Sequence, residues 1–337
     1  MKLNETRILV TGADGFIGSH LVEALVRHHQ CHVTALVLYN AFGQCGWLDS
    51  IASDVKSEID VVAGDIRDET LLLRAMRGCD VVFHLAALVG IPYSYQSPVS
   101  YVDTNVTGTL RVLEAARAAE VRKVVHTSTS EVYGTAEYVP MTEDHRLHAQ
   151  SPYAATKIAA DQLALSFHAT FDTPVAIIRP FNTYGPRQSL RAVIPSVITQ
   201  LASGRRRLQL GALHPTRDFN FVDDTVRGFT AIAASDQTVG EVTNIGSGYE
   251  TSIADVVQLI ADVMECSVQV ETDATRLRPP GSEVDRLCAD NTKAFALTGW
   301  SPGFAGPVGL RRGLERTVRW FCDPENLASY QGKDYHV

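Results

Sequence analysis

The sequence lacks any apolar run long enough to cross a bilayer, and it carries no charged-then-apolar signal segment at its N-terminus. Its six cysteines form no CxxC pair, which argues against both a zinc site and a disulfide scaffold, so we expect free, mostly buried thiols. The eleven histidines include no HExxH and no HxH, which leaves a catalytic metal without a visible ligand set. These absences predict a cytoplasmic protein with no membrane partner and no protein-bound metal.

Positive charge is also scarce, because 30 lysines and arginines face 38 acidic residues and the formal net charge is -8. The basic residues are scattered apart from the triplet at 205–207, so we expect no nucleic-acid partner. What is present is a globular composition, with 45% hydrophobic and 20% charged residues. A chain of 337 residues allows one large domain or two of ordinary size.

Short β-branched runs alternate with helical patterns through the first half of the chain. The runs are RILVTG, HVTALVL, IDVVAGD, DVVFHLAA, KVVHTSTS and VAIIRP, and the helical patterns cover about residues 16–29, 69–77, 104–119 and a stretch that starts near Pro152. Such alternation, with nearly unbroken apolar strands, is typical of a parallel sheet with helices on both faces. We therefore predict an α/β protein with a Rossmann-type doubly wound parallel sheet.

The regular alternation of strand and helix patterns ends at about Phe181, and longer loops rich in proline, glycine and arginine separate shorter elements from there on. Loops of this kind often carry function. We predict a cofactor-binding domain over residues 1–180, which includes the reactive helix, and a smaller C-terminal α/β substrate domain over residues 181–337.

A glycine-rich turn follows the first strand in TGADGFIGSH. Spaced glycines let such a turn close tightly and bring backbone N–H groups up to a pyrophosphate. The ends of the third strand (AGDIRD) and the fourth strand (HLAA) are expected to border the same crevice. The predicted cofactor residues are Gly12, Gly15, Phe16, Ile17, Gly18, Asp65, Ile66, Leu85, Ala86 and Ala87, with Tyr153 and Lys157.

The end of the second strand offers neither of the residues that discriminate between the two nicotinamide dinucleotides. An acid there binds the ribose 2′-hydroxyl of NAD, and an arginine accommodates the 2′-phosphate of NADP. This chain has Val37, Leu38, Tyr39 and Asn40 instead. The absence of a basic group favours NAD, and NADP stays open.

Tyr153 and Lys157 lie four residues apart, one helical turn on the same face. A lysine cation there is expected to lower the pKa of the phenol, so that Tyr153 takes a proton from a sugar hydroxyl while hydride leaves the same carbon. Thr129, at the end of the preceding strand, is expected to hydrogen-bond that hydroxyl.

These motifs together resemble the extended short-chain dehydrogenases/reductases that act on nucleotide sugars, the NAD-dependent epimerase/dehydratase family. The resemblance covers about residues 7–302 and rests on the glycine pattern, HLAA, SxxYG, YxxxK, RPFNTYGPR and RDFNFVDD. It implies a Rossmann domain that holds NAD or NADP, a C-terminal domain that holds a nucleoside diphosphate sugar, and a homodimer.

Within that family, TSTSEVYG is similar to the 4,6-dehydratases, which carry a glutamate where Glu131 stands. GDP-mannose dehydratases show the same Thr-Ser-Glu series, whereas dTDP-glucose dehydratases have an aspartate in place of Ser130, and xylose-forming decarboxylases share Ser-Glu. Once C4 is a ketone, the C5 proton becomes acidic, and Glu131 is our candidate for the base that removes it. We take Thr129, Ser130, Glu131, Tyr153 and Lys157 as the catalytic set.

Longer segments, ALVLYNAFGQCGWLD among them, resemble the N-acetylglucosamine 4,6-dehydratases of the legionaminic acid pathway, which act on UDP- or GDP-linked sugar. The leading interpretation is therefore a nucleotide-sugar 4,6-dehydratase. A C4 epimerase or a UDP-glucuronate decarboxylase is the alternative, and a non-catalytic dinucleotide-binding protein on the same fold is the third.

The resemblance also suggests residues that hold the substrate. Asn182 matches a family asparagine that contacts the diphosphate or sugar, and Arg217 and Arg278 match arginines that clamp the pyrophosphate. Arg187 and Arg191 are further candidates, each with a loop salt bridge as the other interpretation.

Overall fold

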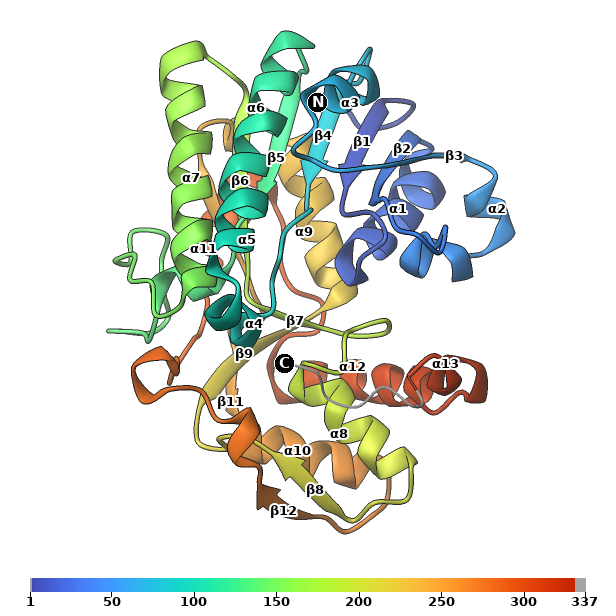
Figure 1. Ribbon diagram of the computed structural model, residues 1–337. Coiled ribbons are helices and arrows are strands. Elements are labelled where there is room, and N and C mark those ends of the chain that lie inside the picture. Colours follow the sequence, from blue (N-terminus) through green and yellow to red (C-terminus); the bar gives the residue numbers. More distant parts are fainter. Residues whose placement is uncertain (1, 331–337) are drawn as a thin grey trace.

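The computed structural model describes residues 2–330 (Figure 1). The strands are β1 (Arg7–Thr11), β2 (His32–Leu38), β3 (Ile59–Gly64), β4 (Val81–His84), β5 (Lys123–Thr127), β6 (Val175–Pro180), β7 (Asn182–Tyr184), β8 (Arg207–Leu210), β9 (Thr216–Phe221), β10 (Val242–Ile245), β11 (Glu250–Ser252) and β12 (Gln269–Thr272). The α-helices are α1 (Phe16–His29), α2 (Ser53–Lys56), α3 (Glu69–Ala75), α4 (Ile91–Gln96), α5 (Pro98–Tyr101), α6 (Gly108–Ala118), α7 (Pro152–Phe171), α8 (Val193–Ala202), α9 (Val222–Ala234), α10 (Ile253–Val263), α11 (Thr292–Thr298), α12 (Gly306–Phe321) and α13 (Pro324–Ala328). No helix within residues 2–330 has the length and apolar character that a membrane span requires.

A seven-stranded parallel sheet in the order β10-β6-β5-β4-β1-β2-β3 forms the larger part of the molecule. The central strands are buried on both faces, whereas the edge strand β3 is largely exposed. Ile8 and Val10 pack into the cluster that includes α1 and α9, whereas Leu9 packs into the cluster that includes α3, α6 and α7. Helices therefore cover both faces of the sheet, and the predicted doubly wound α/β fold is confirmed.

The chain returns to this sheet after residue 180. Strand β10 pairs in parallel with β6, and Val242 lies opposite Ile177. Helix α9 packs behind the sheet, where Phe229 is fully buried and meets Phe83 of β4 edge to face at 6.2 Å between ring centroids. The second half of the sequence thus supplies one strand and one covering helix to the larger part, in addition to the smaller part.

The smaller part lies beyond the carboxyl ends of the central strands (Figure 1). It contains a three-stranded sheet in the order β11-β9-β7 and a two-stranded parallel sheet of β12 and β8, with α8, α10 and α12 around them. Ligands of open parallel sheets bind at the carboxyl ends of the strands. This arrangement therefore places the smaller part over the edge where a ligand would lie.

Candidate active site

A cavity of about 610 Å³ opens at the carboxyl ends of the central strands. It is lined by all ten of the backbone-turn and strand-end residues predicted for the cofactor: Gly12, Gly15, Phe16, Ile17, Gly18, Asp65, Ile66, Leu85, Ala86 and Ala87. Tyr153 lines it as well, whereas Lys157 lies beneath the surface of the cavity. The sequence prediction and the geometry thus point to one crevice.

The glycine turn fits a dinucleotide because it has no room for side chains. Gly12 has φ 68°, and a Cβ added there would lie 2.8 Å from the backbone nitrogen of Ala86. A Cβ at Gly18 would lie 2.1 Å from the carbonyl oxygen of Gly12, so the helix packs directly on the turn. These are the roles that glycines play in a turn that receives a pyrophosphate.

A second cavity of about 490 Å³ lies between the larger and smaller parts of the molecule. Phe16, Thr129, Glu131, Tyr153 and Asn182 are among the residues that line both cavities. The predicted reactive residues therefore stand at the junction, where a cofactor in the first cavity and a substrate in the second would meet.

Tyr153 and Lys157 project from the first turns of α7. Ser151 caps this helix by accepting the N–H of Ala154, and Pro152 occupies its first position. The Lys157 ammonium donates to the carbonyl oxygen of Thr127 at 2.6 Å. Burial lowers the pKa of Lys157 to about 8, so the side chain is still mainly a cation at neutral pH.

The pKa of Tyr153 is raised, whereas we expected Lys157 to lower it. Burial raises it, and the hydrogen bond from the Thr129 hydroxyl opposes that rise only in part. The Glu131 charge raises it further. The net direction is thus upward, because desolvation of the phenolate outweighs the effects that favour it.

Glu131 belongs to a tight turn after β5, the 3₁₀ segment η3 (Ser130–Tyr133), and Thr129 is the N-cap of this segment. The Thr129 hydroxyl accepts the backbone N–H of Glu131 at 3.2 Å, which fixes the start of the turn. Ser130 is buried and lines only the first cavity, whereas Glu131 lines both. Glu131 is therefore the carboxylate of this turn that can reach a substrate.

The predicted arginines divide into two groups. Arg217, Arg278 and Arg191 line the second cavity, and Glu283 lies 3.1 Å from Arg217 and 3.7 Å from Arg278. Arg187 lines neither cavity, because it pairs with Glu23 of α1 at 2.7 Å. The salt-bridge interpretation thus holds for Arg187.

Two buried polar atoms in the second cavity have no hydrogen-bond partner among residues 2–330. They are Oδ1 of Asn182 and one terminal nitrogen of Arg278, which lies within ion-pair distance of Glu131 (3.9 Å) and Glu283 (3.7 Å) but forms no hydrogen bond with either. Buried polar groups are almost always hydrogen-bonded. An acceptor and a cationic donor left open beside the reactive turn suit a polar, anionic ligand.

Asp161 is a fully buried carboxylate on the same helix as Tyr153 and Lys157, and we did not predict a role for it. It lies one turn after Lys157 on α7, accepts the Ser128 hydroxyl at 2.7 Å, and binds Arg179 through nitrogens at 3.0 and 3.2 Å. His126 Nε2 lies 3.3 Å from its other oxygen. Burial alone would raise the pKa of Asp161, but His126 and Arg179 outweigh it and lower the value. In the sequence, the four-residue spacing between Lys157 and Asp161 indicates that both side chains lie on the same face of the helix.

Replacing Asp161 with asparagine is expected to lower the free energy of unfolding by about 3–5 kcal/mol, because the Arg179 charge would be left buried without its partner. Chemical denaturation would measure this loss. Asp172→Asn is the matched control, since Asp172 is exposed at the end of the same helix with φ 53°, a conformation that asparagine accepts. A loss below about 1 kcal/mol for Asp161→Asn would contradict a stabilising role of the pair.

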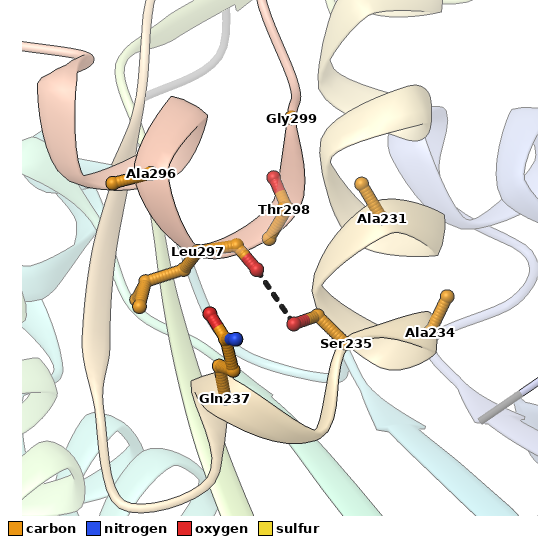
Figure 2. Close-up of a pocket in the computed structure, with 8 residues that line it drawn as sticks. All are labelled: Ala231, Ala234, Ser235, Gln237, Ala296, Leu297, Thr298 and Gly299. Carbon is orange, nitrogen blue, oxygen red and sulfur yellow. Dashed lines mark hydrogen bonds between the residues drawn. The ribbon is translucent and has the colours of Figure 1, made fainter.

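A third hollow, of about 360 Å³, lies between the end of α9 and α11, away from these residues (Figure 2). Small residues, three alanines and a glycine, make up half of its lining, and the Ser235 hydroxyl donates to the carbonyl oxygen of Leu297 at 2.6 Å (Figure 2). None of the predicted site residues lines it, so it is separate from the candidate active site.

The sequence matches the GDP-mannose 4,6 dehydratase family over residues 9–312. The chain belongs to this family. The predicted membership of the NAD-dependent epimerase/dehydratases is thereby confirmed, and this family member is an enzyme.

Relatives of this dehydratase-family enzyme carry out three different reactions. A UDP-glucose 4-epimerase of Mycolicibacterium smegmatis is 37% identical over 94% of this chain and 98% of its own length. A UDP-N-acetyl-α-D-glucosaminuronate decarboxylase of Bacillus cytotoxicus is 34% identical over 95% of this chain and 99% of its own. The crystal structure of a dTDP-glucose 4,6-dehydratase from Streptomyces venezuelae, with NAD and TYD bound, has a TM-score of 0.84 and 33% identity, and covers 95% of this chain and 98% of its own. Overall similarity thus leaves the reaction to be argued from the site.

Proposed function

We propose that this enzyme is an NAD-dependent nucleotide-sugar 4,6-dehydratase that converts an N-acetylglucosamine-type nucleotide sugar into its 4-keto-6-deoxy form. The observation that carries the proposal is the Glu131 carboxylate, which lines both cavities together with Tyr153 and Thr129. An enzyme that only moves hydride to and from C4 has no step for this acid. The dehydratase with NAD bound among its structural relatives supports the same class and cofactor.

The first half-reaction is oxidation at C4. Tyr153 accepts the proton of the C4 hydroxyl, while the Thr129 hydroxyl holds that oxygen in place. Lys157 contributes a buried positive charge one helical turn after Tyr153 on α7. Bound NAD supplies the hydride acceptor for C4, a positive ring that favours the phenolate of Tyr153, and later the hydride for C6.

The second half-reaction is loss of water across C5 and C6. Glu131 removes the C5 proton, now acidic beside the C4 ketone, and donates a proton to the departing C6 hydroxyl. After hydride reaches C6, a proton drawn from solvent through Glu131 restores C5, and Tyr153 releases the proton that it took from the C4 hydroxyl. One water is lost overall, and no external oxidant is consumed.

The substrate's diphosphate would lie between Arg217 and Arg278, whose planar guanidinium groups suit pairs of phosphate oxygens. Asn182, with its open acceptor, would receive a hydroxyl of the sugar or a neighbouring donor. Residues 181–337 would mainly hold the nucleotide sugar, and a homodimer belongs to this proposal through the family resemblance.

One observation favours the alternative, an enzyme that acts on a uronic acid sugar. Arg191 lines the second cavity, and one of its terminal nitrogens would lie 3.4 Å from a Cβ added to Gly90. No carboxylate within residues 2–330 forms a salt bridge with Arg191. A free cation in that place could bind a C6 carboxylate. The second candidate is therefore a C4 epimerase or decarboxylase of a UDP-uronic acid.

The mass of the product in heavy water separates the two candidates. The purified enzyme would receive UDP- and GDP-N-acetylglucosamine, GDP-mannose, UDP-glucose and UDP-glucuronic acid in parallel. We expect loss of one water, with solvent deuterium at C5, from an N-acetylglucosamine substrate. Loss of carbon dioxide, or unchanged mass with inverted C4, would overturn the dehydratase and establish the alternative.

A further inference from the structure

The residues at the end of β2 that line the first cavity, Leu36, Val37 and Leu38, have no polar side chain that could recognise the adenosine ribose. Val37 is buried, while Leu38 and Tyr39 expose 61% and 74% of their surface. In a dinucleotide-binding sheet this strand end normally carries an acid that binds the ribose 2′-hydroxyl. The recognition of that ribose must therefore come from another segment.

A carboxylate reaches this strand end from the glycine turn. Asp14 lines the first cavity together with Leu36, Val37 and Leu38. The backbone N–H of Leu38 faces its carboxylate and partly offsets the rise in the pKa of Asp14 that burial causes. The Asp14 side chain is thus at the place where the missing acid of β2 would stand.

The backbone around Asp14 is fixed from three sides. The N–H groups of Gly12 and Ala13 donate to the carbonyl oxygen of Leu36 at 3.1 and 3.3 Å, so the turn is tied to β2. The N–H of Trp47 donates to the carbonyl oxygen of Asp14 at 3.0 Å, and a Cβ on Gly46 would lie 2.6 Å from the same oxygen. These contacts hold the backbone of Asp14 beside the end of β2.

The surrounding charges do not offset that of Asp14. Arg67 is the only basic residue among residues 2–330 that lines the first cavity, and Asp65 already binds it with nitrogen-to-oxygen distances of 2.6 and 3.0 Å. No lysine or histidine lines the first cavity among residues 2–330. A phosphate there would meet an unscreened carboxylate and an arginine that is already paired.

We propose that Asp14 accepts a hydrogen bond from the 2′-hydroxyl of the adenosine ribose and repels a 2′-phosphate, and so selects NAD over NADP. A phosphate monoester carries about -1.5 to -2 charges at neutral pH, so its contact with a carboxylate is repulsive. The same carboxylate accepts a hydroxyl proton through a charge-assisted bond. This selection does not depend on which sugar the enzyme converts.

Dissociation constants for NAD and NADP, measured by calorimetry on cofactor-free enzyme, test the assignment. We expect the unaltered enzyme to bind NADP at least about 100-fold more weakly than NAD, and Asp14→Asn to narrow that ratio about tenfold or more. Asp49→Asn is the control, because Asp49 is an exposed acid nearby that lines neither cavity and should leave the ratio unchanged. An Asp14→Asn ratio within about twofold of the original would overturn the proposal.

A second measurement can be decided on the unaltered enzyme alone. The unaltered enzyme should bind 2′-deoxy-NAD about 10- to 100-fold more weakly than NAD, the loss expected for one hydrogen bond to a charged group. In Asp14→Ala the two cofactors should bind alike, because the partner of the hydroxyl is gone. Equal binding of NAD and 2′-deoxy-NAD by the unaltered enzyme would exclude Asp14 as the ribose partner, even if the variants failed to fold.

Discussion

Tyr153→Phe is expected to reduce turnover by about 10²- to 10⁴-fold, the usual cost of removing a general acid or base. The variant keeps the ring and its packing against Tyr101, whose ring centroid lies 6.3 Å away, and loses only the hydroxyl. Oxidation at C4 should therefore fail at its first proton transfer. A single-turnover reaction with the nucleotide sugar would show this as absence of reduced cofactor.

Tyr184→Phe is the matched control for that experiment. Tyr184 is also a fully buried tyrosine, but its hydroxyl donates to the carbonyl oxygen of Leu310 at 3.2 Å and lines neither cavity. We expect a small loss of stability and normal cofactor reduction. Undiminished turnover in Tyr153→Phe would remove Tyr153 as the base and, with it, the first step of the proposed mechanism.

Glu131→Gln is expected to separate the two half-reactions. Glutamine has nearly the same shape but cannot take a proton, so C4 oxidation should proceed while loss of the C6 hydroxyl falls by about 10²- to 10⁴-fold. In heavy water the variant should accumulate reduced cofactor and show no exchange of the C5 proton. Mass spectrometry of the recovered sugar, with cofactor absorbance measured in parallel, would test both expectations.

Glu283→Gln provides the comparison within the same cavity. Glu283 holds Arg217 and Arg278, so its loss should change KM, but the bound substrate should still exchange its C5 proton. If Glu131→Gln exchanged that proton at the normal rate, the carboxylate would have no role at C5. A loss of exchange in Glu283→Gln alone would move the base to Glu283.

The residues predicted for the cofactor could be chosen from the sequence because they are local features, and the fold places them around one cavity. Glycines in a strand-to-helix turn and small residues at strand ends are read from a few neighbouring positions. The same holds for Tyr153 and Lys157, which share one helix. The family resemblance added Glu131 to these, through a motif of eight residues.

Features that depend on distant contacts could not be predicted in this way. The sequence leaves Arg187 open between a substrate residue and a loop salt bridge, because its partner Glu23 lies 164 positions earlier in the chain. The pKa of Tyr153 rises because the folded protein buries the phenol, and burial is not visible in a four-residue spacing. Asp14 comes beside the end of β2 only in the folded chain, so its place in the cavity could not be predicted from the sequence.

Because β10 and α9 return to the large sheet, the second half of the chain is not a separate unit that a relative's half can simply replace. A chimaera spliced once at residue 180, with a substrate half from a relative, would have to match two interfaces as well as the substrate cavity: the β6–β10 pairing and the packing of α9. Without β10, strand β6 would become an open edge that invites pairing with other chains. If the second cavity holds the substrate as proposed, new specificity is therefore more accessible through single changes at residues that line it, such as Asn182, Arg217 and Arg278, than through replacement of the whole half.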